Sequence, residues 1–134
     1  MSNQKHLSFA FFEHTMASPY STLKHAIAMF WKCDISRSEL NDISFLQAHF
    51  RNALEACQTN IIKMDHHEFE PEGITIIAIL ADSHAILHTW PEESFVMVEI
   101  FTCGKRASSM AGIDYLIGIF KPKTHDVQDK IIRL

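Results

Sequence analysis

The stretch Ile74–Gly104, ITIIAILADSHAILHTWPEESFVMVEIFTCG, decides the fold of this chain. It contains three apolar runs, ITIIAIL, AILHTW and FVMVEIFTC, whose β-branched and aromatic residues are typical of β-strands. Polar and turn-forming residues separate the runs at Asp82-Ser83-His84 and Pro91–Ser94, and Gly104 ends the third run. Three short strands with tight connections predict an antiparallel meander.

The segments on either side of the meander add helices and further strands. Residues 16–33 repeat apolar side chains at helical spacing, and residues 36–57 carry a second apolar stripe of this kind. We therefore expect helices over these two segments and over 108–120, and strands over 6–12, 60–69 and 125–134, the last at a sheet edge. This order predicts one α+β domain over residues 1–134, a two-layer sandwich in which helices pack on one face of a mostly antiparallel sheet.

The other face of such a sheet would expose the apolar side chains of ITIIAIL and FVMVEIF. A soluble protein rarely leaves so large an apolar surface open to water. A second copy of the chain is the simplest cover, so we expect a homodimer.

The composition is that of an ordinary soluble domain, with 134 residues, 47% hydrophobic and 21% charged. The formal net charge of −4 argues against a nucleic-acid partner, which requires a concentrated basic face. No apolar run is long enough to span a membrane, and the N-terminus lacks the pattern of a signal peptide. We therefore expect a cytoplasmic protein without a membrane partner. Three cysteines without a CxxC motif do not predict a disulfide framework.

Three reactive side chains, Ser83, His88 and Cys103, fall on the predicted strands or at their ends, where a stiff scaffold can hold them in fixed geometry. Each alone has an ordinary alternative, as a turn serine, a strand histidine or a buried thiol. A zinc site of His84, His88 and Cys103 is disfavoured because the two histidines lie about 13 Å apart along a strand, so we expect no metal. A hydrolase is disfavoured because no glycine-flanked nucleophile elbow is present. Cys33 and Cys57 are expected to be structural.

With these residues in place, the central stretch resembles the bacterial S-adenosylmethionine decarboxylases, small pyruvoyl-dependent enzymes of polyamine synthesis. The resemblance lies in the blocks Asp82-Ser83-His84, His88-Thr89-Trp90-Pro91-Glu92 and Phe101-Thr102-Cys103-Gly104. Weaker similarity covers His6-Leu7, the helix from Ser38, Phe69–Gly73 and the last helix. On this alignment the segment 17–33 is expected to be an insertion.

The resemblance implies that the chain cuts itself between Asp82 and Ser83. The Ser83 hydroxyl would attack the carbonyl of Asp82, an acyl shift would turn the amide into an ester, and β-elimination would leave a pyruvoyl group derived from Ser83. That group would form a Schiff base with the substrate amine and serve as the electron sink for decarboxylation. The implied activity converts S-adenosylmethionine to the propylamine donor of spermidine biosynthesis.

The resemblance also implies individual roles for five side chains. His88 matches a histidine that removes a proton during processing, and Thr75 matches a serine that assists the cleavage. Cys103 matches the cysteine that returns a proton to the substrate carbon. Phe69 matches an aromatic that stacks on adenine, and Glu92 matches a carboxylate that binds the ribose hydroxyls.

The sequence departs from the family pattern at three positions. Asp82 stands where the family usually has glutamate, and Thr75 stands where it has serine, a change that predicts slower cleavage. Ala10 falls where an acidic residue of the first strand is expected. Two alternatives therefore stay open: the same chemistry on ornithine or arginine, which Glu92 disfavours, and an uncleaved homologue without catalytic activity.

Overall fold

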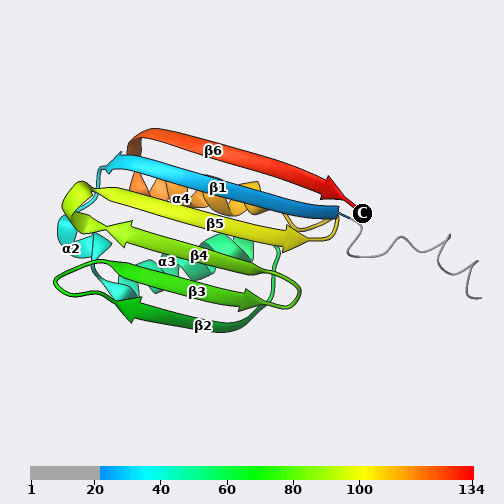
Figure 1. Ribbon diagram of the computed structural model, residues 1–134, viewed down its shortest axis with the longest axis horizontal. Coiled ribbons are helices and arrows are strands. Elements are labelled where there is room, and N and C mark those ends of the chain that lie inside the picture. The colour runs from blue at the N-terminus through cyan, green and yellow to red at the C-terminus, as the bar shows by residue number, and fades with distance from the viewer. Residues whose placement is uncertain (1–21) are drawn as a thin grey trace, which may run out of the picture.

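The computed structural model describes residues 22–134, which form an antiparallel sheet with the strand order β2-β3-β4-β5-β1-β6 (Figure 1). The meander is confirmed, because Ile86 pairs with Ile77 on one side and with Glu99 on the other. In chain order the elements are β1 (Thr22–Cys33), α2 (Arg37–Leu40), α3 (Ile43–Ala56), β2 (Ile61–Glu68), β3 (Ile74–Leu80), β4 (His84–Trp90), the 3-10 turn η1 (Pro91–Glu93), β5 (Phe95–Cys103), α4 (Ser109–Phe120) and β6 (Pro122–Arg133).

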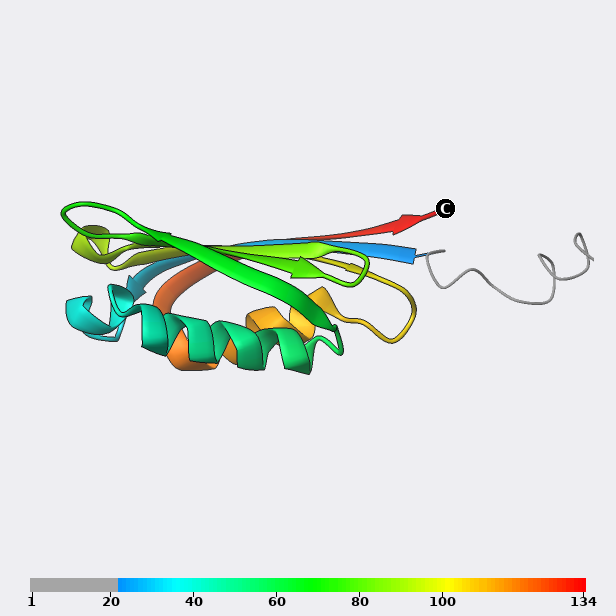
Figure 2. The same cartoon turned by 90° about the horizontal axis from the view of Figure 1, so that it is seen from below.

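The helices lie on one face of the sheet, as Figure 2 shows, so the expected two-layer α+β sandwich is confirmed. The core lies between the layers, where Phe30, Phe50, Leu87, Ile100 and Phe120 are fully buried. Burial of large apolar side chains from both layers is the main contribution that holds the helices on the sheet. Within residues 22–134, no helix has the length and apolar character needed to cross a membrane.

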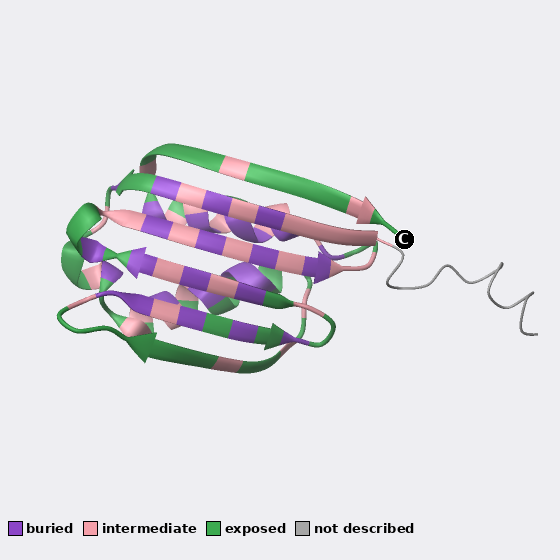
Figure 3. Cartoon of the chain, in the orientation of Figure 1, coloured by how far each residue is buried: buried purple, intermediate pink, exposed green. Residues whose placement is uncertain are grey.

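The opposite face of the sheet, here called the open face, has no helix of the described residues on it. Figure 3 shows buried and partly exposed residues alternating along the strands, as the pleat requires. Apolar side chains nevertheless occupy much of this face: Ile77 and Ile79 of β3 are 46% and 50% exposed, and Trp90 of β4 is 38% exposed. The prediction that the strands present apolar side chains on an uncovered face is confirmed.

The helix expected over residues 16–33 is wrong from residue 22 onward, because this segment forms β1, between β5 and β6. The central part of β1, residues 26–31, is apolar on both faces, so its sequence lacks the alternation of polarity that marks a half-buried strand. Its alanine, leucine and methionine residues also favour helices, and pairing on both edges overrides that preference. The residues that face the helices are Ala26, Ala28 and Phe30, and Ile27 and Met29 lie on the open face.

The helix expected over 36–57 is divided into α2 and α3. The division falls at Asp42, whose carboxylate accepts hydrogen bonds from the backbone N–H groups of Ser44 and Phe45 and so caps α3. The strand expected over 60–69, the helix over 108–120 and the edge strand near the C-terminus are confirmed as β2, α4 and β6. The expected strand over 6–12, with His6-Leu7 and Ala10, lies outside the described residues.

Candidate active site

The turn between β3 and β4 presents Ser83 next to Cys103. The backbone N–H of Leu80 donates to the Ser83 carbonyl at 3.0 Å, and the Ser83 hydroxyl donates to the Asp82 carboxylate at 3.2 Å. The Cys103 thiol, at the end of β5, donates to the backbone carbonyl oxygen of Asp82 at 3.3 Å. The thiol therefore contacts the carbonyl that the neighbouring hydroxyl would attack.

The Cys103 thiol is suited to giving a proton. Partial burial and then the negative charge of Asp82 raise its pKa, so the sulfur keeps its hydrogen at neutral pH. Cys33 and Cys57 differ, because they are buried in the core, where burial raises the pKa of each to about 11. All three cysteines are free, and the burial of Cys33 and Cys57 agrees with the expectation that they are structural.

His88 lies at the other end of β4, opposite Thr75 of β3. The Thr75 hydroxyl and the His88 Nδ1 are 2.8 Å apart and share a hydrogen bond. Burial lowers the pKa of His88, and the charge of Glu99 only partly opposes this effect. The ring is therefore neutral near pH 7 and held in one orientation, which is the state that a general base requires.

Beside His88 a cavity of about 320 Å³ opens between the β2–β3 loop and η1. A cavity of this size lies within the range of small-molecule sites. Phe69 is 50% exposed, and Glu92 of η1 is exposed to solvent. Four residues singled out in the sequence line this one cavity: Phe69, Thr75, His88 and Glu92.

Ser83 and His88 do not meet within one chain. They are five residues apart on an extended strand, which separates them by about 16 Å at the usual rise per residue. The structure thus brings Ser83 together with Cys103 at one end of the sheet, and Thr75 and His88 together at the other. The predicted residues form two half-sites.

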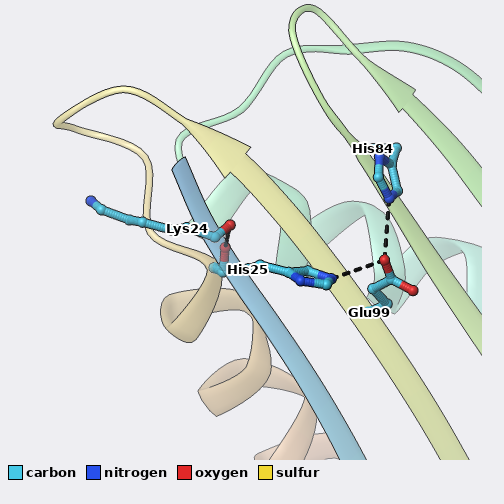
Figure 4. Close-up of polar contacts among 5 residues, drawn as sticks. Lys24, His25, His84 and Glu99 are labelled. Atoms are coloured by element: carbon cyan, nitrogen blue, oxygen red, sulfur yellow. Dashed lines mark hydrogen bonds and ion pairs between the residues drawn. The ribbon is translucent and has the colours of Figure 1, made fainter. Parts of the chain in front are cut away.

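Between the half-sites, Glu99 of β5 forms a cluster that the sequence did not reveal (Figure 4). One of its carboxylate oxygens is 3.0 Å from His25 Nε2 and 3.3 Å from His84 Nε2. The ring of Phe101 stacks on His84 and meets His25 edge-on. Burial is the largest single effect and opposes ionisation of Glu99, but the hydrogen bonds and the charges of His25 and His84 together outweigh it and lower the pKa of Glu99. The acidic residue inside the run FVMVEIF is the signal that the sequence offers, but its partner His25 lies in a segment for which the sequence predicts a helix.

No group of three His, Cys, Asp or Glu side chains within residues 22–134 is arranged to hold a metal ion. The shared carboxylate oxygen of Glu99 itself stands between the imidazoles of His25 and His84. His88 lies farther along β4 and bonds to Thr75.

Comparison with known proteins places this geometry in a family. The profile of the S-adenosylmethionine decarboxylase family matches residues 24–131. The chain is 35% identical over 115 residues to S-adenosylmethionine decarboxylase proenzyme 2 of Bacillus cereus, covering 85% of this chain and 91% of that protein. It is 33% identical over 106 residues to the S-adenosylmethionine decarboxylase proenzyme of Methanococcus aeolicus, covering 79% and 89%. The crystal structure of the adenosylmethionine decarboxylase from Aquifex aeolicus superposes with a TM-score of 0.74 at 24% identity, over 82% of this chain and 89% of that one, and so supports the fold.

The extent of the family match corrects one expectation from the sequence. The match begins at residue 24 and includes most of β1, so the segment 17–33 is not an insertion from that residue onward. His6-Leu7 and Ala10, which were aligned with the first strand of the family, precede the matched region. A profile match over most of the chain, together with identity above 30% to relatives that it nearly spans, is sufficient to conclude that the chain belongs to the S-adenosylmethionine decarboxylase family.

Proposed function

We propose that this chain is a proenzyme that cuts itself between Asp82 and Ser83 and then decarboxylates S-adenosylmethionine to the propylamine donor of spermidine synthesis. The observation that carries the proposal is the contact of the Cys103 thiol with the Asp82 carbonyl oxygen, beside the Ser83 hydroxyl. Relatives named as proenzymes support the self-cleavage. No contact in the described residues favours ornithine or arginine as substrate, or an uncleaved homologue.

The proposed cleavage starts when the Ser83 oxygen attacks the carbonyl carbon of Asp82 and its hydroxyl proton passes to a base. The C–N bond then breaks, which leaves an ester at the Ser83 oxygen and a free amine at residue 83. Removal of the α-proton of residue 83 expels the Asp82 carboxylate through rupture of the Cβ–O bond and leaves an enamine. The enamine takes up a proton at Cβ to become an imine, and hydrolysis by water releases ammonia and leaves the pyruvoyl ketone. The Cys103 thiol would polarise the carbonyl by donating to its oxygen.

The position of the turn fits a cut at this bond. Strand β3 ends at Leu80 and β4 begins at His84, so the bond between Asp82 and Ser83 lies outside both strands. After the cut, the pairing of β3 with β4, and of β1 with β5 and β6, would still join strands of one fragment to strands of the other. The two fragments would therefore remain in one sheet.

The base that accepts the proton would come from a second copy of the chain. His88 lies about 16 Å from Ser83 along β4 and cannot reach it within one chain. If two open faces pack together about a two-fold axis that crosses the strands near Ile86 and Glu99, the Ser83 end of each chain faces the His88 end of the other. Ser83 and Cys103 of one copy would then meet His88 and the cavity of its partner.

The open face supports a homodimer of this kind. Its exposed apolar side chains, such as Ile77 and Ile79, are a surface that a second copy would remove from water. Glu99 lies in the middle of the face, and His25 and His84 hydrogen-bond its carboxylate. A carboxylate covered in an interface needs such partners, because an unpaired buried charge is strongly unfavourable.

In the processed protein the pyruvoyl carbonyl would supply the electron sink for the loss of carbon dioxide. The groups of this chain would bind and orient the substrate. Phe69 would stack on the adenine, and the exposed Glu92 carboxylate would accept hydrogen bonds from the ribose hydroxyls. The protonated Cys103 thiol would return a proton to the substrate carbon.

Mass spectrometry under denaturing conditions tests the proposal directly. Purified wild-type protein should give two fragments, residues 1–82 and 83–134, and Ser83→Ala should give one intact chain of 15.4 kDa. Ser44→Ala, which removes an exposed hydroxyl on α3, should cleave like the wild type. Carbon dioxide release should then be seen with S-adenosylmethionine and not with ornithine or arginine. A wild-type chain that stays intact under all conditions would refute the self-processing.

A further inference from the structure

Helix α2 holds the β2–β3 loop, residues 69–73, from outside the cavity. The Arg37 Nε donates to one carboxylate oxygen of Glu72 at 2.8 Å, and its Nη2 donates to the other, so the ion pair is bidentate. The Asn41 side-chain oxygen, at the end of α2, accepts a hydrogen bond from the backbone N–H of Gly73 at 2.9 Å. A bidentate arginine–carboxylate pair fixes orientation as well as distance.

Hydrogen bonds also join the two ends of this loop to each other and join its C-terminal end to β4. The backbone N–H of Phe69 donates to the Gly73 carbonyl at 2.8 Å, and the backbone N–H of Ile74 donates to the buried hydroxyl of Thr89 at 3.1 Å. Gly73 has φ of +108°, and a Cβ there would lie 3.2 Å from the Thr89 carbonyl oxygen, so only glycine fits without strain. Residues 70–72 remain, and the side-chain ion pair from Arg37 holds them.

We infer that Arg37 is a positioning residue for substrate binding, which acts through Glu72 to hold residues 70–72 of the loop that lines the cavity next to Phe69. The inference rests on the proposed function, because it takes Phe69 as the surface on which adenine stacks. Arg37 itself touches none of the reacting atoms. A loop that is already ordered binds its ligand more tightly, because binding does not then have to restrict its motion. Arg37 should therefore affect affinity and leave the chemical steps unchanged.

Removal of Arg37 also makes the cavity more negative. This change should strengthen the binding of a cation, whereas the loss of positioning should weaken the binding of any ligand. The hydrogen bond from Arg37 lowers the pKa of Glu72, and Glu72 lines the cavity. Without Arg37 its carboxylate would be an uncompensated negative charge, which would attract a net cation such as S-adenosylmethionine. The affinity for an uncharged nucleoside thioether, 5′-methylthioadenosine, is not affected by this charge and therefore measures the positioning effect alone.

The test compares Arg37→Ala with wild type in both kinetics and binding. We expect KM for S-adenosylmethionine to rise about 3- to 10-fold, within the range for exposed but bidentate pairs, with kcat and self-cleavage unchanged. The affinity for 5′-methylthioadenosine, measured by calorimetry, should fall at least as much. Arg37→Lys should recover part of the affinity. Arg51→Ala removes an exposed arginine from α3 and should change nothing.

A double-mutant cycle separates the ion pair from a general loss of stability. Glu72→Ala should weaken 5′-methylthioadenosine binding by the same factor as Arg37→Ala, and the double variant should bind no more weakly than either single variant. Additive losses, or wild-type affinity in Arg37→Ala, would overturn the inference while the decarboxylase assignment stands. Wild-type protein that does not bind the nucleoside at all would overturn the proposed stacking of adenine on Phe69, and the inference with it.

Discussion

The two ends of β4 carry different halves of the proposed chemistry. At one end Ser83 lies beside the Cys103 thiol, which contacts the carbonyl of the bond that we propose is cut. At the other end His88 bonds to Thr75 beside a cavity large enough for a small molecule. Burial raises the pKa of the thiol and lowers the pKa of the imidazole, so both groups are neutral near pH 7, one as a proton donor and the other as a proton acceptor. Neither end holds the donor, the acceptor and the bond together.

The difference between the ends follows from the geometry of a strand. His84, Ile86 and His88 alternate with buried residues and therefore share the open face. The strand is too long for its two ends to meet, and too stiff to fold back. Two half-sites on one face, at opposite ends, would complete each other in the proposed dimer, in which a second chain lies antiparallel across them. The predictions below test this pairing.

The largest effect is expected when a charge is placed in the middle of the open face. Ile77→Asp should cost a single chain little, because this side chain is 46% exposed, but it would bury an unpaired carboxylate in the dimer. We expect a monomer by light scattering and loss of self-cleavage together. Ile131→Asp, an exposed isoleucine of β6 away from this face, is the matched control. A monomeric Ile77→Asp chain that cleaves at the wild-type rate would rule out the pairing.

The second prediction concerns His88 and complementation between chains. His88→Ala alone should slow cleavage about 10²- to 10⁴-fold, the usual contribution of a general base. Co-expressed with Ser83→Ala, the His88→Ala chain keeps its own Ser83 and gains an imidazole from its partner. It should then be cut, while the Ser83→Ala chain stays intact, and a mass tag on one chain distinguishes them. If the His88→Ala chain stays intact in the mixture, the base acts within its own chain.

The separation of the half-sites could be predicted from the sequence in part. The runs ITIIAIL and AILHTW predict strands, and the rise of a strand already places His88 about 16 Å from Ser83. The contact of Cys103 with the Asp82 carbonyl could not be predicted, because it depends on the register between β4 and β5. The cluster around Glu99 could not be predicted either, because residues 26–31 are apolar on both faces and the sequence predicts a helix for the segment that contains His25. Pairing with the two neighbouring strands β5 and β6 makes that segment a strand, and no local sequence pattern indicates this pairing.

A third and smaller effect is expected at Cys103. Cys103→Ala should still cleave, because the attacking hydroxyl and the base are untouched, although more slowly without the hydrogen bond to the Asp82 carbonyl. Decarboxylation by the cleaved protein should fall about 100-fold, as expected for loss of a general acid. Product analysis should also show incorrect protonation of the substrate carbon. Unchanged turnover in the cleaved variant would exclude the thiol as the proton donor.

The smallest effect is expected at Thr75, which tests how the His88 ring is held. Loss of one hydrogen bond worth about 1 kcal/mol predicts that Thr75→Val slows cleavage about fivefold, and Thr75→Ser should cleave at least as fast as wild type because it keeps the hydroxyl without the methyl group. The base requires a neutral imidazole, so the cleavage rate should fall as pH drops through the pKa of His88. Burial holds that pKa below the ordinary value of 6.5, so wild-type protein should keep more than half of its full cleavage rate at pH 6.5, where half of an unperturbed imidazole would be protonated. A rate profile with its midpoint at or above 6.5 would show that His88 is not the group that titrates, and Thr75→Val cleaving at the wild-type rate would show that the hydrogen bond does not orient the base.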